Sequence, residues 1–210
     1  RLFCFGYGYT ADYLGHALQI SDDAWTVGGT TRDSERRREL LARRVRARIF
    51  DADHPIEDPR LVFGRISHLL ISTPPNDLGD PVFNTHAQDL INLPNLKWVG
   101  YLSSAAVYGD RGGGQVNETS EVRPTSQRGS RRALAEKQWL SLHQKYGLPV
   151  HIFRLAGIYG PGRSALDSVR AGVARRIDKP GHVFNRIHVE DIVQTLLASF
   201  AKPNPGGIYN

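Results

Sequence analysis

Short apolar runs alternate along this chain with longer stretches in which apolar residues recur every three or four positions. The short runs are continuous, as in Leu69-Leu70-Ile71, which is typical of parallel strands covered on both faces. This alternation predicts parallel strands joined by crossover helices. We expect strands at residues 2–5, 25–29, 47–51, 68–72, 97–103 and 149–154.

Helical spacing is clearest in two groups of residues: Ala135, Trp139 and Leu142, and Ile192, Leu196 and Phe200 with Val193 and Leu197 beside them. Turn-forming glycines and prolines cluster at residues 74–75, 112–114 and 160–162. The pattern therefore predicts an α/β fold with a doubly wound parallel sheet. Residues 207–210, where the chain stops, read like the inside of a strand, so we expect a C-terminal portion beyond Asn210.

The first expected strand runs into a glycine-containing turn and then a helical stretch. Its sequence, Gly6-Tyr7-Gly8-Tyr9-Thr10-Ala11, fits the dinucleotide fingerprint G-x-G-x-x-G/A in its required context. Gly6 permits the tight turn, Gly8 lets the backbone approach a pyrophosphate, and Ala11 allows close helix–strand packing. Free N–H groups at the helix start would hold the phosphates. A plain strand–helix turn is the alternative reading.

The end of the second strand indicates which dinucleotide is bound. NAD-binding folds tend to place an acidic residue there, about 20 residues after the glycines. Here Thr31 and Arg32 occupy that position, and a guanidinium matches a 2′-phosphate. Asp33 comes one position late and can cap the next helix instead. We therefore expect NADP rather than NAD. Asp51 and Ala52, after the third strand, are placed to meet the adenine, although Asp51 can equally be a turn residue.

The sequence resembles the short-chain dehydrogenase/reductase superfamily, specifically its extended branch of NAD-dependent epimerases and dehydratases. The matching landmarks follow in order along nearly the whole chain: the glycine turn, Y-L-S-S-A-A-V-Y-G at 101–109, Glu118 with Arg123-Pro124, R-L-A-G-I-Y-G-P at 154–161, and H-V-E-D at 188–191. The resemblance implies a single Rossmann domain over residues 1–210. It also implies a small substrate-binding portion at about 157–188 and beyond the C-terminus given.

The same resemblance implies a catalytic serine, tyrosine and lysine, of which only the serine carries over, as Ser104. The family stretch Y-G-x-[ST]-K aligns with residues 128–132, where Arg128 replaces the tyrosine and Arg132 replaces the lysine. Arginine stays protonated and cannot act as a general base. Arg132 can hold the ribose and Arg128 can polarise a carbonyl. The resemblance is therefore to atypical members with a degenerate site; Tyr108 is an alternative proton donor.

Further cofactor contacts are expected where strands end. The segment Ser72-Thr73-Pro74-Pro75 follows the fourth strand, where the chain passes the cofactor phosphates and ribose, and Ser103 ends the fifth. Ordinary loop and strand-end hydrogen bonding are the alternatives for these residues. By resemblance, Ala156 and Gly157 lie beside the nicotinamide.

Composition narrows the possibilities further. The chain is 40% apolar and carries a net charge of +6, with 22 arginines against five lysines. The densest run, at 35–48, fits a solvated helix face with Leu40 and Leu41 inward; no nucleic-acid-binding module accompanies it. A single cysteine, Cys4, and the lack of ligand motifs argue against a metal site. No apolar run approaches the roughly 20 residues of a membrane span and no signal-peptide pattern opens the chain, which predicts a cytoplasmic protein.

Two functions remain open. The first is an oxidoreductase or epimerase acting on a polar, anionic, sugar-like small molecule, for which Arg128, Arg163, Arg186 and His188 would supply the anion contacts. Each of these arginines alone fits a surface position, and His188 fits a structural role. The second is a non-catalytic module that senses NADP for a partner. The resemblance also implies a homodimer through helices near residues 82–92 and 129–145.

Overall fold

A computed structural model describes residues 1–21, 24–175, 178 and 183–210. Its main feature is a seven-stranded sheet in the order β3-β2-β1-β4-β5-β6-β9, with every neighbouring pair parallel. The strands are β1 (Leu2–Phe5), β2 (Val27–Thr31), β3 (Arg46–Ile49), β4 (His68–Ile71), β5 (Trp98–Ser104), β6 (Val150–Leu155) and β9 (Ile208–Tyr209). The order reverses between β1 and β4. The predicted doubly wound α/β architecture is therefore confirmed.

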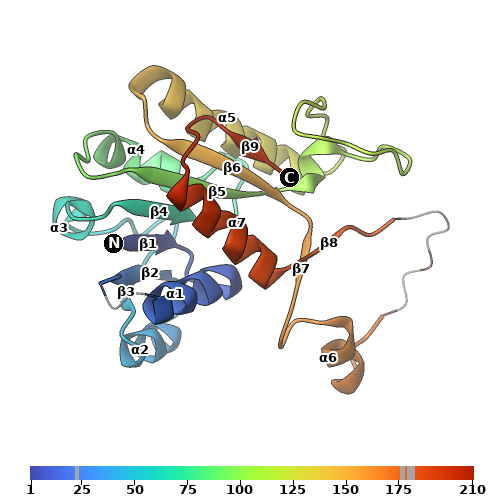
Figure 1. The fold of residues 1–210 in the computed structure, drawn as a ribbon, viewed down its shortest axis with the longest axis horizontal. Helices are drawn as coiled ribbons and strands as arrows, with labels where there is room; N and C mark the ends of the chain where they lie inside the picture. Colours follow the sequence, from blue (N-terminus) through green and yellow to red (C-terminus); the bar gives the residue numbers. More distant parts are fainter. Residues whose placement is uncertain (22–23, 176–177, 179–182) are drawn as a thin grey trace.

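Helices cover both faces of the sheet. They are α1 (Tyr9–Ser21), α2 (Ser34–Ala42), α3 (Pro59–Phe63), α4 (Pro81–Ile91), α5 (Gln127–Tyr146), α6 (Ala165–Arg170) and α7 (Val189–Ala201), with a 3₁₀ turn, η1, at Ala105–Tyr108. Figure 1 shows α1 and α7 together on the near face, while α4 and α5 lie behind. None of these helices, within the described ranges, is long and apolar enough to cross a membrane.

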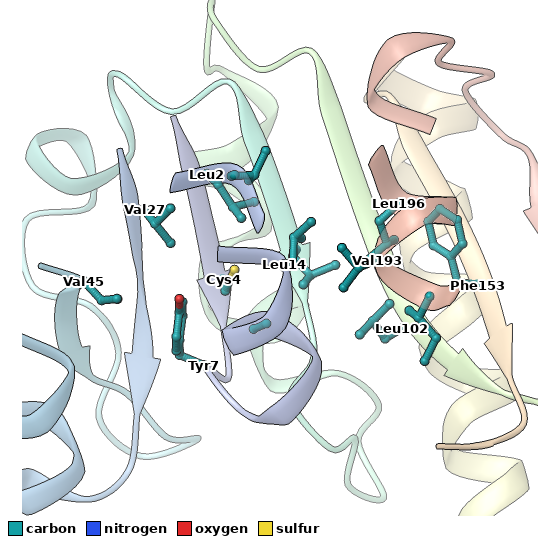
Figure 2. Packing of buried hydrophobic residues seen from close by; sticks show 14 of the residues in the cluster. Leu2, Cys4, Tyr7, Leu14, Val27, Val45, Leu102, Phe153, Val193 and Leu196 are labelled. Carbon is teal, nitrogen blue, oxygen red and sulfur yellow. The ribbon is translucent and has the colours of Figure 1, made fainter. Parts of the chain in front are cut away.

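Two apolar clusters make up most of the core, one on each side of the sheet. On the near side, Leu14 of α1 and Val193 and Leu196 of α7 point toward the strands, as Figure 2 shows. On the far side, Trp139 and Leu142 of α5 pack against the other face. Because both faces are covered, the strands can be apolar at every position, which explains the continuous runs in the sequence.

The predicted strands are all present, with ends shifted by at most two residues. Two-residue shifts occur at β2 and at the end of β3; β2 begins at Val27 because Trp25 lies outside the strand and packs its ring against His68 and Phe200. The expectation for Leu41 was wrong. Leu40 is fully buried but Leu41 is 45% exposed, since adjacent residues of a helix point in different directions.

A separate two-stranded sheet lies beyond the end of β6. Strands β7 (Gly157–Tyr159) and β8 (Arg186–His188) pair in parallel and, with α6, stand apart from the main sheet (Figure 1). We call this part, formed by the described residues of 157–188, the small lobe. Residues 176–177 and 179–182 of the expected substrate-binding portion lie outside the described residues.

Candidate functional site

A cleft of about 540 Å³ opens where the strand order reverses, at the carboxyl ends of β1, β2, β3 and β4. This is the place where ligands bind in open α/β sheets. The residues that line it are Gly6, Tyr7, Gly8, Thr30, Thr31, Arg32, Phe50, Asp51, Ala52, Asp53, Ser72, Thr73, Pro74, Pro75, Asn76 and Pro81. The structure thus brings together most of the positions predicted for the pyrophosphate turn, the ribose and the adenine.

The glycine turn forms one wall. Gly6 has φ +79°, a conformation that strongly favours glycine, and a Cβ there would lie 3.1 Å from the Thr73 nitrogen. Its N–H donates to Thr30 Oγ1 at 2.8 Å. Gly8 differs, because a Cβ there would meet nothing closer than the Gly6 carbonyl oxygen at 4.0 Å. The space over Gly8 is therefore open to a ligand, while Ala11 is buried where α1 meets the sheet.

The opposite wall contains an unsatisfied hydroxyl. Thr73 is only 9% exposed, lines the cleft and has no hydrogen-bond partner for Oγ1. A buried hydroxyl without a partner is energetically costly unless a ligand or water satisfies it. Ser72 and Pro74 line the cleft beside it, as the sequence predicted.

The third side of the cleft carries a positively charged side chain. Arg32 is exposed and lines the cleft with Thr31. The neighbouring acid, Asp33, is the N-cap of α2. Its carboxylate accepts hydrogen bonds from the N–H groups of Glu35 (2.7 Å) and Arg36 (2.9 Å). These hydrogen bonds hold the pKa of Asp33 below its ordinary value. The residue that could imitate a ribose-binding acid is thus a helix cap.

Asp51 lies at the cleft, and its carboxylate also holds a turn. It lines the cleft together with Ala52 and Asp53. Its carboxylate also organises the turn, accepting from the N–H groups of Asp53 and His54 at 2.9 Å each and contacting the His54 ring at 2.8 Å. The hydrogen bond from His54 is the main cause that lowers the pKa of Asp51.

Several predicted cofactor residues lie outside the lining of this cleft. Tyr9, Thr10 and Ala11 form the start of α1. Ala156 and Gly157 lie past β6, where the Gly157 N–H donates to the Asn185 carbonyl at 3.1 Å. Ser103 is buried and its hydroxyl donates to Glu136 Oε1 at 2.5 Å.

Two of the three predicted catalytic residues, Ser104 and Arg132, have structural partners of their own. Ser104 Oγ accepts from the Ala106 N–H at 3.2 Å and caps η1. Arg132 donates to the Leu102 carbonyl at 2.5 Å and to the Tyr101 hydroxyl at 3.2 Å. Arg128 is exposed in the first turn of α5, and its side chain makes no hydrogen bond or ion pair with the part of the chain that the structure describes.

Tyr108, the alternative proton donor, is enclosed. It is 2% exposed, its hydroxyl accepts from Arg154 at 2.8 Å and donates to Asn210 Oδ1 at 2.7 Å, and the Arg154 guanidinium lies over its ring. The hydroxyl is therefore occupied in a buried network.

Three of the side chains predicted to contact an anion already make other contacts within the protein. His188 caps α7, with Nδ1 accepting from the Glu190 N–H at 3.4 Å. Arg163 lies over the ring of Tyr9 and Arg186 over that of Phe184. Within the described residues, no group of three histidine, cysteine or acidic side chains could hold a metal ion.

Other residues that line the cleft were not predicted from the sequence: Thr30, Phe50, Asp53, Asn76 and Pro81. Thr30 is the most informative, because its hydroxyl fixes the first glycine of the turn. Its position at the carboxyl end of a strand was the available signal, since parallel strands present that end to the ligand.

Comparison with known proteins gives a consistent result. The model of the NAD dependent epimerase/dehydratase family matches residues 88–210. Protein YeeZ of Escherichia coli K12 is 32% identical over 136 residues, which are 63% of this chain and 47% of YeeZ. The chain therefore matches about half the length of that curated relative.

Solved structures share the whole fold. A conserved protein of unknown function from Silicibacter pomeroyi is 44% identical, with a TM-score of 0.85 over 100% of this chain and 70% of its own. The dTDP-glucose 4,6-dehydratase of Bacillus anthracis, solved with NAD, has a TM-score of 0.77 over 100% of this chain and 74% of its own. At 18% identity, that second likeness shows the fold alone.

Proposed function

Because this chain belongs to the NAD-dependent epimerase/dehydratase family, we propose that it binds a nicotinamide dinucleotide in the cleft between the glycine turn and the Ser72–Pro75 loop. The observation that carries the proposal is the pairing of an open space over Gly8 with the buried, unpartnered hydroxyl of Thr73. The first suits a pyrophosphate and the second needs a polar ligand atom. The NAD bound to the Bacillus anthracis dehydratase supports the same ligand class.

We propose NADP(H) as the preferred form. Arg32 is the cation of the cleft wall, and Asp33, which could otherwise receive the ribose hydroxyls, is committed to capping α2. A guanidinium beside the adenosine ribose favours a 2′-phosphate over a hydroxyl. Asp51 and Ala52 would then contact the adenine side.

The proposed reaction is an oxidation–reduction or epimerisation at a hydroxyl or carbonyl carbon of a polar, anionic, sugar-like molecule. The nicotinamide would supply hydride transfer. Ser104 would orient the substrate oxygen, Arg128 would polarise it, and Arg132 would provide positive charge near the ribose. In this proposal the site is degenerate, because both arginines occupy positions where the resembled family has its tyrosine and lysine.

A second candidate is a module that binds the cofactor and reports its redox state without turnover. Two observations favour it: Arg132 is tied to the Leu102 carbonyl, and the Tyr108 hydroxyl is enclosed between Arg154 and Asn210. Neither arrangement leaves an evident proton donor beside Ser104.

Calorimetry with NADP, NADPH, NAD and NADH tests the binding, and turnover assays with nucleotide sugars and small ketones follow. We expect binding of NADP(H) and weaker binding of NAD(H). If the protein binds none of the four dinucleotides, both candidate functions are contradicted. Tight binding without turnover over the whole substrate panel would favour the sensor.

A further inference from the structure

Tyr9 joins two segments that are 152 positions apart in the sequence. It begins α1, directly after Gly8 of the glycine turn. Its hydroxyl donates a hydrogen bond of 2.9 Å to the carbonyl oxygen of Pro161, in the loop that follows β7 of the small lobe. The turn proposed to hold the dinucleotide is thus connected directly to the small lobe.

The surrounding packing is built around this phenol. A Cβ at Gly160 would lie 2.6 Å from the Tyr9 hydroxyl and 2.8 Å from Val189 Cγ1, so a side chain there would have to displace one or both of these groups. From the same loop, the Arg163 guanidinium lies 5.4 Å from the centre of the Tyr9 ring, within cation–π distance. Three contacts of different kinds therefore meet on one side chain.

The loop itself is a closed turn. The Arg163 N–H donates to the Gly160 carbonyl at 2.9 Å, and the Gly160 N–H donates to the Arg163 carbonyl at 3.4 Å. A displacement of the Pro161 carbonyl must therefore move the whole turn. Partial desolvation, followed by the hydrogen bond with Tyr13, raises the pKa of Tyr9.

We propose that Tyr9 couples occupancy of the dinucleotide cleft to the conformation of the Gly160–Arg163 loop. A ligand held by the glycine turn fixes the backbone at Tyr9, which fixes the phenol and, through it, the Pro161 carbonyl. Because coupling is reciprocal, a substrate that orders the loop also tightens the dinucleotide. The inference rests on the proposed function; within it, Tyr9 is a positioning residue that acts through the loop.

Hydrogen exchange read by mass spectrometry tests the coupling, with NADPH as the probe. Two segments are followed: residues 5–11, which report on the turn, and residues 157–164, which report on the loop. NADPH is titrated separately for each variant, and exchange is compared at saturation, so that a change of affinity does not enter the result. In the wild-type protein we expect NADPH to slow exchange in both segments, by about fivefold or more in the loop, the lower end for coupled sites.

Tyr9→Phe keeps the ring and removes the donor. We expect NADPH to slow the turn segment of this variant and to leave the loop segment nearly unchanged. Arg163→Ala weakens the connection from the loop side and should give a smaller response than the wild type. Tyr146→Phe is the matched control, because it removes the hydroxyl of a 55% exposed tyrosine at the end of α5, outside both segments.

The outcomes separate the two proposals. If NADPH slows the turn of wild-type protein but the loop responds equally in wild type and Tyr9→Phe, the coupling is wrong and the proposed function stands. A loop that ignores NADPH in the wild type also overturns the coupling. If NADPH neither binds nor slows the turn, the proposed NADP(H) site fails and the coupling falls with it.

Discussion

The carboxylate of Glu136 and the guanidinium of Arg154 form an ion pair inside the molecule, with each side chain 4% exposed and the closest contact at 2.8 Å. Arg154 reaches Glu136 through Nε as well, and the Ser103 hydroxyl donates to the same carboxylate. The pair links α5 to β6 beside the predicted catalytic residues.

Removing one partner of this pair should be costly. Glu136→Gln leaves the Arg154 charge buried without its counter-ion, and we expect the free energy of unfolding to fall by about 3 kcal/mol. Urea denaturation at neutral pH measures the change. Asp77→Asn is the matched control, because Asp77 pairs with Arg131 at similar distances (2.7 and 2.8 Å) but is 70% exposed. Equal losses in the two variants would show that burial is not what makes the Glu136 pair important.

The two glycines of the turn should respond differently to the same change. Gly6→Ala places a Cβ against the backbone of Ser72 and Thr73 at a positive φ, so we expect a stability loss on the order of 1–2 kcal/mol. Gly8→Ala meets open space and should fold normally, while its methyl group occupies the proposed pyrophosphate position. We expect its NADPH affinity to fall by about tenfold or more.

Thermal unfolding and calorimetry on both glycine variants check this contrast. A Gly8→Ala protein with wild-type affinity for NADPH would contradict the proposed position of the pyrophosphate. A Gly6→Ala protein as stable as the wild type would contradict the close approach of the turn to Thr73.

Arg32 should discriminate between the two dinucleotides. Because charge-assisted hydrogen bonds contribute about 1.5–3 kcal/mol, Arg32→Asp should weaken NADP binding by roughly 10- to 100-fold and affect NAD little. Calorimetry with both cofactors measures the ratio. Arg60→Asp makes the same charge change at an exposed site outside the cleft lining and serves as the control. Equal weakening of NADP and NAD by Arg32→Asp would refute its assignment to the 2′-phosphate.

The predictable part of this molecule is set by local patterns. Continuous apolar runs required a sheet covered on both faces, and the glycine spacing placed the first turn. Asp33 was recognisable as a potential cap because caps act over two or three residues. These inferences needed only neighbouring residues, and the structure places both the turn and the cap where the sequence indicated.

The unpredictable part depends on contacts between distant residues. Ser103 and Ser104 are adjacent in one motif, yet one hydroxyl donates to Glu136 and the other accepts from the Ala106 N–H. Alternation along a strand says that they differ in direction but not which partner each finds. The hydrogen bond between Tyr9 and Pro161 joins residues 152 positions apart, so no local sequence pattern predicts it.

Asp80 should make stability depend on pH. It is fully buried; one carboxylate oxygen caps α4 through the Val82 and Phe83 N–H groups, and the other has no hydrogen-bond partner. Burial raises the pKa of Asp80 to about 6 from an ordinary 3.8, although those two hydrogen bonds and the charge of Arg132 act in the opposite direction. A raised pKa means that the folded state holds the proton more tightly than the unfolded state. The stability that protonation gives is therefore complete below pH 3.8 and is lost as pH rises through about 6.

Asp80→Asn should remove this dependence while keeping a good helix cap, since asparagine caps as well as aspartate. We expect the variant to gain about 2–3 kcal/mol relative to wild type between pH 4 and pH 7, from 1.36 kcal/mol per unit of pKa shift. Urea denaturation at intervals of half a pH unit measures the difference. Asp110→Asn, at an exposed aspartate that accepts from the Gly112 N–H, is the control and should run parallel to wild type. If the free energy of unfolding changes with pH in the same way for Asp80→Asn and wild type, the Asp80 carboxyl has the same pKa in the folded and unfolded chain. The burial of Asp80 would then not control the pH dependence.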